Sequence, residues 1–187
     1  MKRRQYLHYS FSSLLALWVS PSRLFADSGK NLSRIESIES TWKALARKDF
    51  KILDAWPRIS VSKKDRMTKF SLLEAHILFE EGTEKPYSSP YNSENRAGIY
   101  VCRSCSLALF SSEMKYDSHT GWPSFYTSIP AHLAKKTDYK LIWPRIEYHC
   151  VKCGGHQGHV FNDGPAPTYE RWCNNGASLT FIETKSA

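Results

Sequence analysis

The sequence predicts a small β-rich domain preceded by helices, and three observations support this fold class. From residue 98 onward, short apolar runs alternate with Gly, Pro, Asn and Ser, which is typical of strands joined by turns. These runs are "GIYVC", "YHCVKC", "GHVFN" and "SLTFIE". Before them, apolar residues recur at helical spacing, and two CxxC pairs within the β-rich part indicate one metal site.

The predicted helices lie in two stretches. Residues 28–57 carry apolar side chains at near-helical spacing. These are Leu32, Ile35, Ile38, Trp42, Leu45 and Leu53. A second helix is predicted from about Lys64 to Phe79, ending near Gly82, because glycine is a common residue just after a helix.

The N-terminus predicts a signal peptide over residues 1–26. It has a basic start, an apolar run from about Phe11 to Val19 and small residues near Ala26. The run is too short to span a bilayer as a mature helix, so an uncleaved anchor is the weaker alternative. Arg3 and Arg4 followed by "QYL" resemble a twin-arginine core, with an ordinary secretory signal as the alternative. We therefore expect export to the periplasm by the twin-arginine route.

Net charge and length limit the function class and the number of domains expected for the chain after residue 26. The sequence has 26 basic and 18 acidic residues; residues 1–26 hold four of the basic and none of the acidic ones, which leaves a net charge of +4. This mildly basic balance is not the footprint of a nucleic-acid-binding protein. We expect a helical extension over residues 27–62 and one domain over residues 63–187, which acts as a monomer.

Four of the five cysteines form two knuckles. Cys102 and Cys105 lie in "CRSC", Cys150 and Cys153 lie in "CVKC", and Cys173 stands alone. Two CxxC pairs about 44 residues apart can present four thiolates to one tetrahedral zinc ion. Such a closed site leaves no position for substrate, so the zinc is expected to be structural. Two disulfides are the alternative in an oxidising compartment.

The lone cysteine has the neighbours of a nucleophile. Cys173 is close in sequence to Arg171 and to the pair His156 and His159. A cation favours the thiolate, and a histidine can donate a proton to a leaving oxygen. The alternative is an inert buried cysteine with ordinary polar neighbours.

The histidine pair allows two further interpretations. His156, His159 and Asp163 could form a second metal site, or the pair could be fortuitous. Side chains three residues apart on a regular strand point to opposite faces, so one shared pocket requires a bend near Gly158.

Four segments together resemble one known family. They are "EEGTEKPYSSPY", "GIYVCRSCSLALFSSEMKYDSHTGWPSFY", "YHCVKCGGHQGHVFNDGPAPT" and "RWCNNGASLTFIE". Over roughly residues 64–184 the chain is similar to methionine sulfoxide reductase B, which reduces the R epimer of methionine sulfoxide. The resemblance implies a mainly β fold of two antiparallel sheets with short peripheral helices, and one structural zinc ion per chain in the four knuckle cysteines. It also implies a role in protein repair under oxidative stress.

The resemblance assigns roles to single residues. It makes Cys173 the nucleophile, and Trp122 in "GWPSF" the ring that receives the substrate methyl group. The residues matching the rest of the catalytic set are His159, His156, Asn175, Arg171 and Asp163. Structural alternatives are a core tryptophan, a turn-forming aspartate and a surface-paired arginine.

The implied mechanism begins with attack of the Cys173 thiolate on the sulfoxide sulfur. Protonated His159, with His156, supplies a proton as the S–O bond breaks, which leaves methionine and a sulfenic acid. Many family members carry a resolving cysteine where this chain has Thr120. We therefore expect a small thiol or a thioredoxin-like protein to reduce the sulfenic acid directly.

The chain also departs from the family beside the nucleophile. Trp172 and Asn174 stand where a tyrosine-like and an aliphatic residue are more usual, and Asn174 is expected to alter packing behind Cys173. Two competing functions remain: a non-catalytic zinc-ribbon binding module, and a disulfide oxidoreductase that uses one unmetallated CxxC pair.

Overall fold

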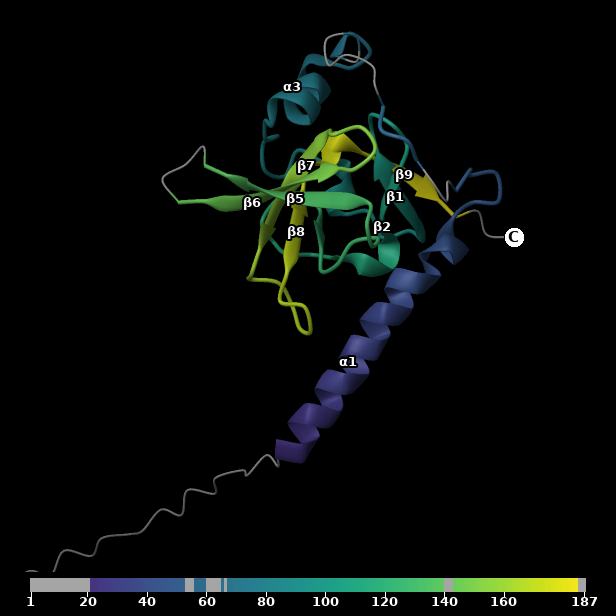
Figure 1. Cartoon of the computed structure of the whole chain (residues 1–187), viewed down its shortest axis with the longest axis vertical. Coiled ribbons are helices and arrows are strands. Elements are labelled where there is room, and N and C mark those ends of the chain that lie inside the picture. Colours follow the sequence, from purple (N-terminus) through teal and green to yellow (C-terminus); the bar gives the residue numbers. More distant parts are fainter. Residues whose placement is uncertain (1–20, 53–55, 60–64, 66, 140–142, 185–187) are drawn as a thin grey trace, which may run out of the picture.

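The computed structural model describes residues 21–52, 56–59, 65, 67–139 and 143–184. It shows two β-sheets with helices at the periphery (Figure 1). Most of the predicted signal peptide, residues 1–20, lies outside the described residues. In the described part of the chain, no helix is both long enough and apolar enough to cross a membrane.

The first helix, α1 (Pro21–Thr41), continues into the 3-10 helix η1 (Trp42–Leu45). Its N-terminal end points away from the sheets, and its C-terminal end lies beside them (Figure 1). Ile35, Ile38 and Trp42 are buried. The helix predicted within residues 28–57 is present but ends at Leu45, where the backbone becomes extended at the next residue.

A capping box sets the start of α3 (Leu72–Glu80). The Ser71 hydroxyl accepts a hydrogen bond from the Glu74 amide at 3.3 Å, and the Glu74 carboxylate accepts one from the Ser71 amide at 2.9 Å. This reciprocal pairing satisfies amides that have no partner within the helix, so α3 starts at Leu72. The predicted start at Lys64 lies outside the described residues, and Asp65 and Met67 are helical. Three further 3-10 helices among the described residues are η2 (Pro90–Asn92), η3 (Ser112–Met114) and η4 (Gly176–Ser178).

The strands form two antiparallel sheets, as the fold prediction stated. The smaller sheet has the order β2 (Ala108–Ser111), β1 (Gly98–Cys102) and β9 (Leu179–Glu183). The larger sheet has the order β3 (Lys115–Tyr116), β4 (Ser124–Phe125), β8 (Arg171–Asn174), β7 (His156–Phe161), β6 (Arg145–Cys150) and β5 (Leu133–Asp138). The four β-like runs of the sequence contain β1, the end of β6, most of β7 and β9.

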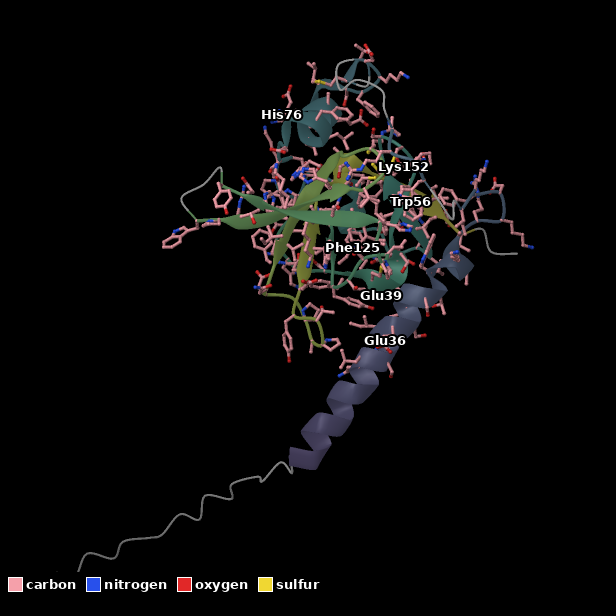
Figure 2. All side chains as sticks on the ribbon, in the orientation of Figure 1. Glu36, Glu39, Trp56, His76, Phe125 and Lys152 are labelled. Carbon is pink, nitrogen blue, oxygen red and sulfur yellow. The ribbon has the colours of Figure 1, made fainter. Side chains whose placement is uncertain are left out.

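Aromatic side chains fill the core between the sheets, where Figure 2 shows Phe125. Phe110 stacks on Phe125 with ring centroids 4.0 Å apart, and Tyr148 packs edge-on against Trp172 at 4.9 Å. Trp172 therefore fills the core behind β8. Because side chains alternate along a strand, its neighbour Cys173 faces the other way.

Candidate active site and metal centre

The two CxxC knuckles bring four sulfur atoms together. Cys102 Sγ lies 3.6 Å from Cys153 Sγ, and Cys105 Sγ lies 3.5 Å from Cys150 Sγ. All four sulfurs lie within 4.8 Å of one another. A disulfide requires about 2.05 Å, so none of these four cysteines is disulfide-bonded, and the disulfide alternative is not what the structure adopts.

The backbone around the knuckles points donors at the sulfurs. The residue after each knuckle has a left-handed conformation, with φ of 60° at Ser106 and 72° at Gly154. The Gly155 amide donates to Cys153 Sγ at 3.4 Å, and the buried Gln157 side chain approaches Cys102 Sγ at 3.5 Å. Such N–H donors favour thiolates.

The four sulfurs fit a metal ion. Hydrogen bonds from its neighbours lower the pKa of Cys153, whereas hydrogen bonding to the neighbouring sulfurs raises that of Cys102. Crowded thiols cannot all ionise without a compensating cation, which a divalent ion supplies. The cluster is a structural metal site because it offers no open coordination position.

Cys173 lies on β8, directly opposite Ser124 of β4 on one side and His159 of β7 on the other. Its side chain is partly exposed. Burial raises the pKa of the Cys173 thiol, and the charge and hydrogen bond of Arg171 oppose that rise. Arg171 therefore favours the thiolate, as expected, but burial has the larger effect.

Asp163 holds Arg171 in place rather than contacting the pocket. Two hydrogen bonds of 2.8 Å join the guanidinium to both carboxylate oxygens. The guanidinium carbon also lies 4.4 Å from the centre of the Phe161 ring. Hydrogen bonding to Arg171 lowers the pKa of Asp163, so the pair stays ionised at neutral pH.

A β-bulge places both histidines on the same side of the sheet. Tyr148 pairs with Gly158, but the next residue along β6, His149, pairs with His156, so one residue of β7 is left unpaired between them. The rings of His156 and His159 consequently lie 5.4 Å apart. This is the bend near Gly158 that a shared site requires.

His159 is held by a carboxylate. Its Nε2 lies 3.0 Å from the buried Asp138, which also accepts a 2.6 Å hydrogen bond from Arg145. Burial lowers the pKa of His159, and Asp138 opposes this. The ring is therefore neutral at pH 7 without substrate, which differs from the protonated form expected from sequence.

His156 is completely buried and lies behind His159 instead of lining the pocket. Its Nδ1 is 3.5 Å from a Glu147 oxygen. The potential metal-binding groups in the described ranges that include these histidines pair His156 with Glu147 and His149, and His159 with Glu147 and Asp138. Neither group contains Asp163, so His156, His159 and Asp163 do not form the second metal site that the sequence allowed.

Cys173 opens into a small pocket of about 110 Å³. Its walls include Thr83, Trp122, Arg145, His159, Phe161, Cys173 and Asn175. This volume suits a single side chain and is well below the roughly 300–1,000 Å³ of a typical cofactor site. Gly158 also lines the pocket, and no larger residue fits there because a Cβ would lie 1.9 Å from the Cys173 carbonyl oxygen.

Glu84 links Trp122 to the segment after β8 through hydrogen bonds. Sequence reasoning did not single it out. Its carbonyl accepts a 3.1 Å hydrogen bond from Trp122, and its amide donates to the Asn175 side chain at 3.0 Å. Its carboxylate accepts from the amides of Gly176 and Ala177 at 2.5 and 2.9 Å. Asn175 also donates to a carbonyl of β7, so its side chain orients the loop after the nucleophile.

The unusual Asn174 is accommodated by an equally polar partner. Asn174 is fully buried, and its side-chain oxygen, Oδ1, accepts a 2.8 Å hydrogen bond from the Tyr148 hydroxyl. Its amide group donates to the Asn175 carbonyl and to the Ser178 hydroxyl at 2.7 and 3.0 Å. The Thr120 side chain lies near Cys173 and favours its thiolate, because it lowers the pKa of that thiol.

Sequence reasoning also missed Asp138, Arg145 and Glu147. The last two alternate with His149 in "RIEYH", so ionisable residues at every second position just before and within the predicted run "YHCVKC" were the available signal. No comparable signal marks Asp138, which reaches the site only because β5 pairs with β6.

Together the fold and the site define a thiol-based oxidoreductase that carries a structural metal centre. The model of the SelR domain matches residues 70–183. The chain is 42% identical over 123 residues to a peptide methionine sulfoxide reductase MsrB of Alteromonas mediterranea, covering 65% of this chain and 87% of that protein. It is 47% identical over 107 residues to the MsrB of Methanosarcina barkeri, covering 57% and 75%.

The MsrB of Xylella fastidiosa strain 9a5c is 47% identical over 112 residues, covering 59% of this chain and 72% of that protein. The chain therefore belongs to the methionine sulfoxide reductase B family, the peptide-methionine (R)-S-oxide reductases. Among solved structures, the crystal structure of the Mis18 "Yippee-like" domain matches 49% of this chain and 100% of that chain, with 14% identity and a TM-score of 0.39. That likeness is too weak to support an inference.

Proposed function

We propose that this protein reduces methionine R-sulfoxide in oxidised proteins and peptides to methionine, with Cys173 as the nucleophile. One observation carries the proposal: Cys173, His159 and Trp122 line one side-chain-sized pocket. A zinc-ribbon binding module has no need of that arrangement. A dithiol oxidoreductase is disfavoured because both CxxC pairs converge on the single cysteine cluster.

The reaction starts with the Cys173 thiolate, which attacks the electrophilic sulfur of the sulfoxide. Arg171 stabilises the thiolate, although the resting thiol is mostly protonated because burial raises its pKa. The methyl group of the substrate lies against the Trp122 ring, which the Glu84 carbonyl orients. The R epimer is selected if its sulfoxide oxygen reaches His159 only when the methyl group faces the Trp122 ring.

The proton for the departing oxygen comes through His159. Its Nε2 faces Asp138, which stabilises the imidazolium once negative charge develops on the substrate oxygen. The resting ring is neutral, so it takes its proton from the resting thiol of Cys173, the residue directly opposite His159 in the pairing of β7 and β8. Transfer from Cys173 to His159 would produce the thiolate and the imidazolium together. The attack forms a bond between Cys173 Sγ and the substrate sulfur, and the oxygen takes the proton. The hydroxyl then passes from the substrate sulfur to Cys173 Sγ as the sulfur–sulfur bond breaks; its electron pair stays on methionine, which leaves, and Cys173 is left as a sulfenic acid.

The sulfenic acid is reduced by a thiol from outside the chain. Five cysteines are present in the sequence, and four of them form the metal cluster. Thr120, whose side chain lies near Cys173, has no thiol to offer. We therefore propose a small thiol or a thioredoxin-like protein as reductant.

We propose zinc as the ion of the four-cysteine cluster. Zinc–sulfur bonds of about 2.3 Å in a tetrahedron place the sulfurs about 3.8 Å apart. The separations of 3.5 and 3.6 Å between the two pairs support that ion. The cluster stabilises the fold and takes no part in the reaction.

We further propose that the protein works outside the cytoplasm, after export by the twin-arginine route. The N-terminal sequence supports export. The four thiols would be exposed to oxidation if the chain entered such a compartment unfolded, which favours a route that carries folded protein. Export of folded protein would let the metal bind first. Metal-free, oxidised yet active exported protein would refute this order of events.

A single-turnover assay without reductant tests the reaction. Peptide-bound methionine R-sulfoxide should yield about one methionine per chain, with a sulfenic acid trapped at Cys173, and the S epimer should yield none. The Cys173→Ser variant should yield none with either epimer. If the folded, metal-loaded protein reduces neither epimer, the reductase proposal fails and the binding-module function replaces it.

A further inference from the structure

Three metal-ligating side chains converge outside both the cysteine cluster and the pocket wall. They are Glu147 and His149 of β6 and His156 of β7. One possible ligand atom from each lies within 4.8 Å of the others. His149 and His156 are direct cross-strand partners, and Glu147 lies two residues from His149 on the same face of β6.

Two distances in this cluster match the edges of a metal tetrahedron. Glu147 Oε2 lies 3.5 Å from His156 Nδ1, and Glu81 Oε1, just after α3, lies 3.6 Å from His149 Nε2. Bonds of about 2.0–2.2 Å to a tetrahedral ion place its ligands about 3.3–3.6 Å apart. Glu147 and His156 therefore already have the spacing of two ligands of one ion. Glu81 lies beside His149 but outside the group whose ligand atoms are all within 4.8 Å of one another, so its side chain has to move to complete the site.

We propose that Glu147, His149 and His156 form a second metal site, with Glu81 as its fourth ligand. Two imidazoles with carboxylates suit Zn²⁺ and similar divalent transition metals, whereas Mg²⁺ and Ca²⁺ prefer oxygen ligands alone. Glu147 and His156 are almost fully buried, and His149 is 16% exposed, so an ion reaches the site past His149.

A cation already bridges the two carboxylates. The Lys136 ammonium lies 3.0 Å from Glu147 Oε1 and 3.4 Å from Glu81 Oε1. Its side chain is 63% exposed, so it can turn into solvent when a metal ion arrives. The position thus favours positive charge, and the divalent ion replaces the ammonium there.

Occupation of this site inhibits the reaction, a consequence that rests on the proposed function. The His156 ring lies 5.4 Å from that of His159, and Glu147 is near both His159 and Asp138. An ion that binds His156 and Glu147 fixes both groups and changes the charge beside His159. Proton transfer to the substrate oxygen then slows.

Cobalt titration of the full chain with zinc in the cysteine cluster tests the site. The Cys173→Ser background is used so that no free thiol competes for the ion. About one Co²⁺ should bind and give the visible bands of a tetrahedral nitrogen–oxygen site, without the thiolate-to-cobalt charge-transfer band.

His149→Gln in that background should weaken cobalt binding by about 100-fold or more, since loss of even an outer-shell partner costs about 10- to 100-fold. His76→Gln is the matched control, because His76 lies on α3, is exposed and pairs only with Glu80 among the ion pairs described for it (Figure 2). It should bind cobalt as the parent does. Absence of binding in the parent, or equal affinity of the two glutamine variants, would overturn the site.

Inhibition is measured separately with Cys173 intact. Zn²⁺ should slow single-turnover methionine formation in the parent and in His76→Gln, each relative to its own zinc-free rate, but not in His149→Gln. Equal inhibition of all three would assign the effect to Cys173 and overturn the inhibitory role. If no protein forms methionine without added zinc, the proposed function fails, and the cobalt titration still decides the metal site.

Discussion

The hydrogen bond between Tyr148 and Asn174, next to Cys173, predicts that substitutions of these two residues are energetically coupled. The Tyr148 hydroxyl donates to Asn174 Oδ1 at 2.8 Å, and both side chains are fully buried. Burial raises the pKa of Tyr148 well above its usual value, so the hydroxyl remains a donor at all working pH values. Tyr148→Phe leaves the Asn174 oxygen buried without this donor, and Asn174→Val leaves the Tyr148 hydroxyl without its acceptor.

The expected magnitude follows from these contacts. A buried polar group that loses its partner costs about 1–3 kcal/mol, whereas replacing both partners by apolar groups is close to neutral. Asn174→Val also removes the two bonds donated by its amide, but Ser178 Oγ still donates to the Asn175 carbonyl at 2.7 Å. The double variant should therefore be more stable than the sum of the single effects by about 1–3 kcal/mol.

Urea unfolding of the metal-loaded protein measures the four free energies of the cycle. Each 1 kcal/mol corresponds to about 2–4 °C in melting temperature for a chain of this size, so thermal unfolding gives a second readout. Tyr100→Phe is the matched control: Tyr100 is equally buried, but its hydroxyl has no hydrogen-bond partner in the described structure. That variant should be neutral or slightly stabilising. Additive single effects, or equal losses for the two Tyr→Phe variants, would refute the reasoning.

Three further predictions concern the nucleophile and the metal. Thr120→Cys should supply an internal resolving thiol, because the Thr120 side chain is close enough to Cys173 to lower the pKa of its thiol. After one turnover, mass spectrometry should find a disulfide between positions 120 and 173 instead of a dimedone-reactive sulfenic acid. Asp163→Asn should shift the pH profile of Cys173 alkylation to lower pH, because the negative charge of Asp163 raises the pKa of that thiol. The alkylation rate follows the thiolate fraction, which grows as pH rises through the pKa. Removal of the metal by a strong chelator should lower the melting temperature by at least about 10 °C, because the four thiolates hold two distant segments together.

Each of these has a control and a contradicting result. Wild-type protein with trapped sulfenic acid is the reference for Thr120→Cys, and persistence of that acid in the variant would contradict the predicted proximity. Asp117→Asn, at an exposed aspartate paired with His119, should leave the alkylation profile unchanged; an equal shift in both variants would rule out a local effect of Asp163. An unchanged melting temperature after verified metal loss would contradict a structural role for the cluster.

The sequence by itself determined the fold class and the family. Strand-like runs with turn residues between them indicated the sheets, and short-range spacing indicated the two knuckles, because both depend on local geometry. The tetrathiolate cluster could be predicted because each CxxC loop holds its two sulfurs on one side. The motifs around Trp122, His159 and Cys173 named residues that do share one pocket.

Only the tertiary structure decided how those residues are supported. The bulge opposite Tyr148 and His149 puts two histidines on one side, and strand pairing brings Asp138 to His159. Glu84 reaches the pocket from a segment about 90 residues before β8. These contacts depend on register and on long-range packing, which no local pattern encodes. The charge states of Cys173 and His159 likewise depend on burial, and burial exists only once the two sheets have closed around the core.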